Sequence, residues 1–136
     1  MTKPVPQLQR YMTTTPHAIG KEQTLELAHR MMRDNQIRHL PVLHGGKLVG
    51  LLTQRDLALI ETLRDVDPAK VTVDDAMSTN VFSVDPATPL DEVVSTMAER
   101  KYGCCVAMQN AKVVGIFTTV DACRALAELL HGRLAK

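Results

Sequence analysis

The chain has 136 residues, of which 45% are hydrophobic and 3% aromatic, and its 16 basic residues nearly balance its 15 acidic ones. A formal charge of +1 provides no global field for nucleic acid or an anionic membrane, and so few aromatic rings argue against a stacking platform for single strands. The length suits one compact domain or two small units that share a core.

The first half reads as β-α-β-β-α. A short extended piece at 16–19 precedes an amphipathic helix over 24–36, whose apolar face includes Leu25, Ala28 and Met32. Two apolar runs, 38–43 and 47–52, surround Gly45 and Gly46 and predict a hairpin. Pro41 has no N–H for a ladder, which favours an edge or irregular position. A second helix is expected over 53–63.

The second half repeats this order. A short strand at 81–84 is followed by a helix that ends near Lys101, with Thr88 predicted as its N-cap and Pro89 in its first turn. Strands at 104–108 and 112–117 and a helix over 119–131 complete it. The polar stretch 65–70 contains Pro68 and is interpreted as a linker.

The two halves match without a gap when the chain is shifted by about 65 positions. Gly-Leu-Leu-Thr-Gln-Arg-Asp at 50–56 falls on Gly-Ile-Phe-Thr-Thr-Val-Asp at 115–121. The repeat predicts an α/β (α+β) fold of two equivalent units, 1–64 and 71–136, that pack about a pseudo-twofold axis, with linker 65–70 between them. A ligand is then expected between the halves.

The repeated Gly-apolar-apolar-Thr-x-x-Asp phrase carries the candidate chemistry. Asp56 and Asp121 are carboxylates able to accept hydrogen bonds from a ribose diol. Thr53 and Thr118 precede them at predicted helix starts, where free N–H groups favour a phosphate. The alternative is that Thr-x-x-Asp is only a capping box, which needs no ligand.

This doubled pattern resembles a tandem pair of cystathionine-β-synthase (CBS) domains, a Bateman module, over nearly the whole chain. The resemblance implies two clefts between the repeats and a regulatory role in binding AMP, ADP, ATP or S-adenosylmethionine, without a cofactor and without enzymatic activity.

The family pattern implies that each cleft takes its Thr and Asp from one repeat and its adenine-flanking residues from the other. One cleft would combine Thr53, Asp56 and Leu51 with Phe82, Val84 and Tyr102. The other would combine Thr118, Asp121 and Ile116 with His17, Ile19 and Ile37.

The two implied clefts differ in charge. The positions that contact phosphate in the family are Arg38 and His39 in the first repeat but Gly103 and Cys104 in the second. Arg55 also lies inside the first phrase, where the second has Val120. Phosphate is therefore expected to be favoured only beside Thr53 and Asp56.

Other site classes find little support. No His or Cys spacing predicts a metal site, and no nucleophile, P-loop or paired-carboxylate motif predicts an enzyme. No apolar run approaches a membrane span of about 20 residues, so a cytoplasmic protein without membrane or nucleic-acid partners is expected. Cys105 is predicted in the core, whereas Cys104 is a candidate cleft thiol.

Two further functions stay open. A constitutive dimerisation or docking module with vestigial clefts is the main alternative, and a thiol redox sensor using Cys104 and Cys105 is a third. The family resemblance implies a homodimer that forms through the helices 53–63 and 119–131. It also implies an effector protein, of unknown identity, that responds to the module. The apolar residues in excess of one small core support that surface, namely Leu59, Ile60, Leu126, Leu129 and Leu130.

Overall fold

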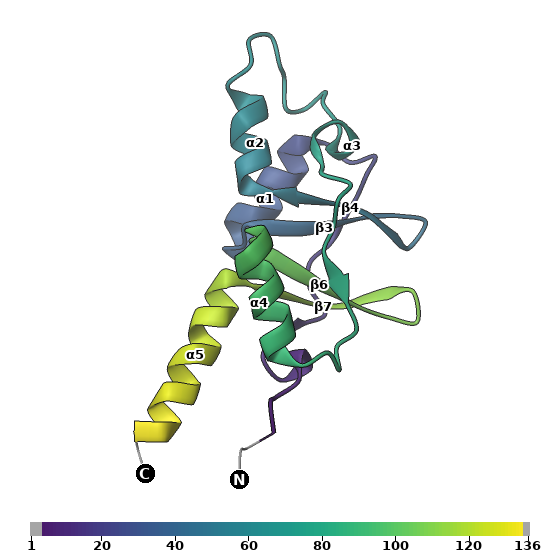
Figure 1. The fold of residues 1–136 in the computed structure, drawn as a ribbon. Coiled ribbons are helices and arrows are strands. Elements are labelled where there is room, and N and C mark those ends of the chain that lie inside the picture. Colours follow the sequence, from purple (N-terminus) through teal and green to yellow (C-terminus); the bar gives the residue numbers. More distant parts are fainter. Residues whose placement is uncertain (1–3, 135–136) are drawn as a thin grey trace. The chain divides into compact units, whose positions relative to one another are not determined.

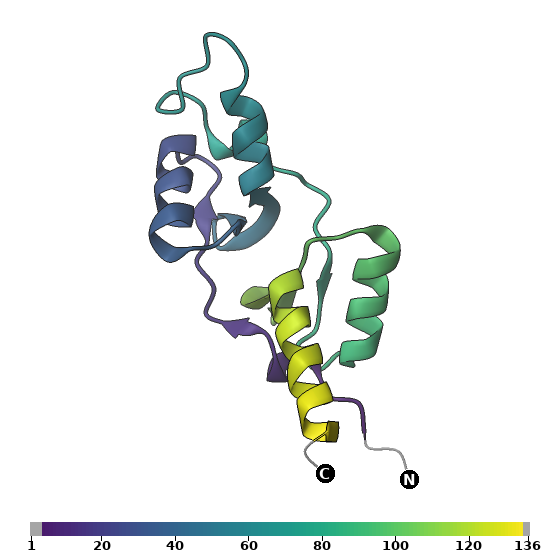
Figure 2. The ribbon, with the colours of Figure 1, turned by 90° about the vertical axis from the view of Figure 1, so that its left-hand side faces the viewer.

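The computed structural model describes residues 4–134 and divides them into two compact units. One unit comprises residues 16–81, and the other joins residues 4–15 to 82–134. We call them the 16–81 unit and the 82–134 unit. Each contains a sheet with helices beside it, as Figures 1 and 2 show, so the mixed α+β fold predicted from the sequence is confirmed.

The 16–81 unit contains β2 (Ile19–Gly20), α1 (Leu25–Asn35), β3 (His39–His44), β4 (Lys47–Thr53), α2 (Gln54–Glu61) and α3 (Val73–Ala76). Its sheet has the order β2-β3-β4, with β2 parallel and β4 antiparallel to β3. The Thr24 hydroxyl caps α1 by accepting the Leu27 N–H at 3.2 Å. The helix buries the predicted apolar face against the sheet.

The 82–134 unit contains η1 (Leu8–Arg10), β1 (Thr13–Thr14), β5 (Ser83–Val84), α4 (Leu90–Arg100), β6 (Cys104–Gln109), β7 (Lys112–Thr118) and α5 (Thr119–Leu134). Its sheet has the order β1-β7-β6-β5. The hairpin between β6 and β7 turns at Asn110 and Ala111, both with positive φ, where the other unit turns at Gly45 and Gly46.

The start of α4 differs from the prediction. Pro89, and not Thr88, is the residue before the helix, and no side chain caps it. The first helical N–H, that of Leu90, instead donates to the Pro6 carbonyl at 2.8 Å, and the Leu8 N–H donates to the Thr88 carbonyl at 2.8 Å. A backbone segment from the chain's beginning therefore replaces the expected hydroxyl cap.

The same arrangement recurs in the other unit, between residues at equivalent positions of the 65-residue repeat. The Leu25 N–H at the start of α1 donates to the Val71 carbonyl at 3.0 Å, and the Val73 N–H donates to the Gln23 carbonyl at 2.8 Å. Each unit is thus completed by the segment that precedes the other sequence repeat.

The exchange continues into the sheets. Thr13 pairs with Ile116 in one unit, and Ser78 pairs with Leu51 in the other. A Cβ on Gly115 would collide with Met12, and one on Gly50 would lie 2.5 Å from the Met77 sulfur. The packing therefore divides the chain near residues 15 and 81, whereas the sequence repeat predicted a break at 65–70, because the exchanged segments bury their apolar residues on the opposite repeat.

Pro41 also lies elsewhere than predicted. It is buried in β3, the central strand of its sheet, opposite Leu51. The backbone N–H and carbonyl of Leu51 bond to Ser78 and not to Pro41, with the Leu51 N–H 2.8 Å from the Ser78 carbonyl. The missing N–H of Pro41 therefore leaves no acceptor on Leu51 unpaired. In the other unit Val106 takes this place and donates its N–H to the Phe82 carbonyl at 2.9 Å.

None of the helices within residues 4–134 has the length and apolar character needed to cross a membrane.

We expect Leu8→Ala to lower the free energy of unfolding by about 2–5 kcal/mol, the usual cost of truncating a fully buried leucine. Leu8 lies in the chain's first turn of helix, yet its side chain is completely buried among Leu90, Val93 and Phe117. Urea denaturation measures the change. Val5→Ala, at a half-exposed position, is the control and should have little effect. A Leu8 variant as stable as the control would contradict the exchanged packing.

Candidate functional site

The first Thr-x-x-Asp phrase forms a complete capping box at the start of α2. The Thr53 N–H donates to Asp56 Oδ2 at 2.9 Å, and the Asp56 N–H donates to Thr53 Oγ1 at 3.1 Å. The interpretation of this phrase as a capping box is therefore confirmed, and a capping box does not exclude a ligand. The box occupies only one carboxylate oxygen, and within residues 4–134 Asp56 Oδ1 has no hydrogen-bond or ion-pair partner.

Three basic residues lie close in the chain or across the sheet to this helix start. His39 begins β3 and pairs across the sheet with Thr53, while the Arg38 carbonyl accepts the Gln54 N–H at 2.8 Å. Burial, followed by the adjacent Arg38 charge, lowers the pKa of His39, and the nearby Asp56 carboxylate opposes this. Arg38 and Arg55 are exposed. The structure thus brings the predicted Arg38, His39, Thr53 and Asp56 into one neighbourhood, with Arg55 next to Asp56 in the chain.

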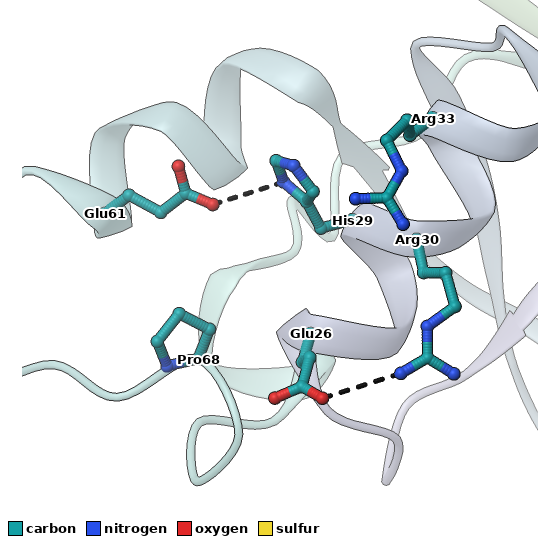
Figure 3. Close-up of a pocket in the computed structure, with 6 residues that line it drawn as sticks. All are labelled: Glu26, His29, Arg30, Arg33, Glu61 and Pro68. Atoms are coloured by element: carbon teal, nitrogen blue, oxygen red, sulfur yellow. Dashed lines mark ion pairs between the residues drawn. The ribbon is translucent and has the colours of Figure 1, made fainter.

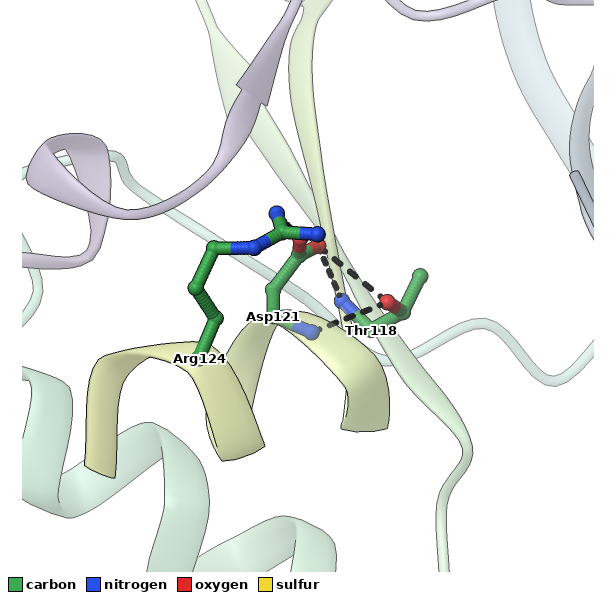
Figure 4. Close-up of polar contacts among 3 residues, drawn as sticks. All are labelled: Thr118, Asp121 and Arg124. Carbon is green, nitrogen blue, oxygen red and sulfur yellow. Dashed lines mark hydrogen bonds and ion pairs between the residues drawn. The ribbon is translucent and has the colours of Figure 1, made fainter. Parts of the chain in front are cut away.

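The second phrase has the same backbone box and a further partner. Figure 4 shows Thr118, Asp121 and Arg124 at the start of α5. Asp121 Oδ2 accepts the Thr118 N–H at 2.9 Å and the Thr118 hydroxyl at 3.2 Å, while Oδ1 accepts from Arg124 Nη1 at 3.2 Å. Asp121 is only 6% exposed. Both of its oxygens are therefore engaged by the protein itself.

Sequence reasoning missed Arg124, although the signal was present. Residues three apart face the same side of a helix, so a basic residue three positions after a helix-start Asp is a candidate partner. The equivalent position in the first repeat is Leu59, which has no polar group to offer Asp56 and is 67% exposed.

The predicted adenine-flanking residues of the second repeat lie together. Phe82 and Tyr102 stack with ring centroids 5.3 Å apart, and both pack with Val84 against the core of the 82–134 unit. Ile116 in the same unit is buried, with 7% of its surface exposed.

Their counterparts in the 16–81 unit are less uniform. His17 is exposed, Leu51 and Ile37 are half-buried, and the Ile19 side chain is 4% exposed within the core. The sequence prediction draws each cleft from both units, so its complete residue set stays a prediction.

The vicinal cysteines are buried strand residues. Burial raises the pKa of Cys104 to about 12, and burial together with the neighbouring Cys104 raises the pKa of Cys105 to about 12. Both are thiols, not thiolates, at neutral pH, and thiols are poor nucleophiles. Cys105 lies in the core as predicted, whereas Cys104 is not the accessible thiol that a redox sensor needs.

A surface groove that the sequence did not predict lies beside α1 and α2. Its volume is about 360 Å³, and Figure 3 shows its lining: Glu26, His29, Arg30, Arg33, Glu61 and Pro68. His29 Nδ1 lies 3.2 Å from Glu61 Oε1 and joins the two helices, while Arg30 pairs with Glu26 at 3.5 Å. These exposed pairs nearly balance in charge, and none of the predicted ligand residues lines the groove. Among residues 4–134 no cluster of three potential metal ligands occurs.

The model of the CBS domain matches the chain twice, over residues 8–60 and 73–128. The chain belongs to the CBS-domain family. This CBS pair is 30% identical over 110 residues to the CBS domain-containing protein YhcV of Bacillus subtilis, which covers 81% of this chain and 78% of that protein.

Solved structures share the fold. A Vibrio cholerae protein called AcuB superposes with a TM-score of 0.86 at 28% identity, over 97% of this chain and 98% of its own. The CBS domain pair of MJ0100, solved with 5′-methylthioadenosine and S-adenosylmethionine, gives a TM-score of 0.83 at 24% identity, over 92% of this chain and 98% of its own. The predicted tandem CBS architecture is thereby confirmed.

We expect the His39 imidazole to titrate below its usual pKa of about 6.5 when followed by NMR. Asp56→Asn should lower the pKa of His39 further, because it removes an attractive charge, and Arg38→Gln should raise it. Because the unfolded chain takes up this proton at higher pH than the folded chain, stability is lost as pH falls below about 6.5. Asp34→Asn, an equal charge change on α1, should leave the titration unchanged. An unaltered titration in both site variants would separate His39 from the Asp56 neighbourhood.

Proposed function

We propose that this CBS pair is a regulatory module that binds an adenosine-containing ligand, namely AMP, ADP, ATP or S-adenosylmethionine, with the ribose on Asp56. The observation that carries the proposal is that Asp56 Oδ1, beside a completed capping box, has no partner among residues 4–134. The box fixes the carboxylate through Oδ2, so that Oδ1 is held in place for a ligand's donor.

A carboxylate held in this way suits a sugar diol. It accepts hydrogen bonds from both hydroxyls, and a hydrogen bond to a charged group is worth about 1.5–3 kcal/mol. The Thr53 hydroxyl accepts the Asp56 N–H and keeps its own hydrogen for a ligand acceptor.

The same neighbourhood suits phosphate. Arg38 and Arg55 are exposed cations near the start of α2, whereas Gly103 and Val120 occupy the equivalent places in the second repeat. Guanidinium groups bind phosphate oxygens through charge-assisted pairs. We therefore propose that nucleotide phosphates favour the first repeat.

The solved MJ0100 pair supports the ligand class, because both molecules in that structure contain adenosine. The family pattern further suggests that adenine lies against Phe82, Val84 and Tyr102. In this proposal the module works in the cytoplasm, performs no catalysis and shifts between conformations by the ligand's differential affinity for them, so that an effector protein reads its occupancy.

We also propose a homodimer. Leu126, Leu129 and Leu130 on α5 are 57%, 43% and 47% exposed, which is unusual for three leucines on one helix. Ile60, by contrast, packs against the core of its own unit and is not part of this surplus. The competing proposal is a constitutive dimerisation or docking module, in which the ligand sites are vestigial.

Calorimetry with AMP and ATP tests the ligand. The Asp56→Ala, Asp121→Ala double variant should lose at least about 1.5 kcal/mol of binding free energy, because it removes both candidate ribose acceptors. The Asp34→Ala, Asp74→Ala variant makes the same charge change at two exposed positions and should bind like the wild type. Equal binding by the site variant would refute the assignment, and absence of binding by the wild type would favour the docking module.

Light scattering tests the dimer. The wild type is expected at twice the mass of the chain, and Leu126→Glu, Leu130→Glu should halve it, because two carboxylates would be buried in an apolar interface. Val5→Glu alters another exposed apolar position and serves as the control. A monomeric wild type would end the proposal.

A further inference from the structure

The two Thr-x-x-Asp boxes are alike in their backbone and differ in the side chain one helical turn later. Arg124 follows Asp121 by three residues, and Leu59 follows Asp56 by three. Arg124 reaches back to the carboxylate, at 3.2 Å, whereas Leu59 has nothing to donate.

We propose that Arg124 occupies the ribose-accepting oxygen of Asp121, so that the residue at this position decides which repeat can take a ligand. The inference rests on the proposed function, and it makes the module a one-site binder at Asp56. Arg124 acts as a specificity-determining residue by competing with the ligand for the carboxylate.

The hydrogen-bond inventory of the two carboxylates supports this. Asp121 accepts three donors and is 6% exposed, which leaves little room for a diol. Asp56 accepts one donor among the described residues and is half-buried. A carboxylate has about four acceptor positions. Asp56 therefore keeps more of them for a ligand than Asp121, which uses three for donors of its own chain.

The contest between arginine and ribose favours arginine. Both donors make charge-assisted hydrogen bonds to the carboxylate, but the guanidinium adds its own positive charge and is attached to the chain three residues away. The Arg124 side chain is 70% exposed, so it is also free to leave into water. The expected effect is therefore a difference in affinity between the repeats, not a permanent block.

Calorimetric titration of the full chain with AMP tests the proposal through stoichiometry. The wild type should bind one AMP per chain, and Asp56→Asn should remove that site. Arg124→Leu, which copies the first repeat, should add a second site, and adding Asp121→Asn to that variant should remove it again. Arg100→Leu, an exposed arginine on α4, is the matched control for lost charge and should leave one site.

The reverse exchange keeps the test independent of how Arg124→Leu folds. Leu59→Arg places a guanidinium three residues after Asp56 and should weaken AMP binding by about tenfold, the lower end of the effect of one charged hydrogen bond. Two equal sites in the wild type, or a single unchanged site in both Arg124→Leu and Leu59→Arg, would overturn the inference. Absence of binding by the wild type to AMP, ATP and S-adenosylmethionine would overturn the proposed function, and the inference with it.

Discussion

The reciprocal exchange of short segments is the constraint on which the remaining structure depends. Residues 6–13 supply the partners for the start of α4 and the edge of β7, and residues 71–78 do the same for α1 and β4. Buried backbone groups need such partners, because leaving one unpaired costs as much as a lost hydrogen bond. Each sequence repeat, cut at the linker, lacks one buried residue of its own core, Val73 for the first and Leu8 for the second. A duplicated sequence has thus become a chain whose halves are obligatory to each other.

This constraint reaches the candidate site directly. Leu51 and Ser78 exchange backbone hydrogen bonds at 2.8 and 2.9 Å, two residues before Thr53. The end of β4, and with it the start of α2, is therefore fixed from both sides, by Ser78 on one and by β3 on the other. A carboxylate that must meet a ligand's hydroxyls at hydrogen-bond distance gains from such a rigid support. The box around Asp56 is a consequence of the fold as much as of its own four residues.

Much of this was accessible from the sequence. Apolar spacing after Thr24 predicted α1, the paired glycines predicted the first hairpin, and the repeated phrase predicted two equivalent helix starts. The exchange was not predictable, because a two-residue strand and one turn of 3-10 helix carry no periodicity and their partners are chosen by tertiary packing. Thr88 had the right chemistry for a cap, yet the Pro6 carbonyl took that place. Arg124 was visible in the spacing, but only the structure shows that it points at Asp121.

A proline removes one backbone donor beside the short strand of each repeat, but at a different end of that strand. Val106 ties β6 to the segment before β5 through the Phe82 carbonyl, at 2.9 Å, whereas Pro41 has no N–H to give the equivalent carbonyl of His17. On the other side of the short strand the difference is reversed. The Lys21 N–H donates to the Leu43 carbonyl at 3.0 Å, whereas Pro86, at the equivalent place in the second repeat, has no N–H. Local openings begin where backbone bonds are fewest, and amide hydrogen exchange detects them. The two prolines thus loosen opposite ends of equivalent short strands, so amide exchange is expected to begin before β2 in the first repeat and after β5 in the second.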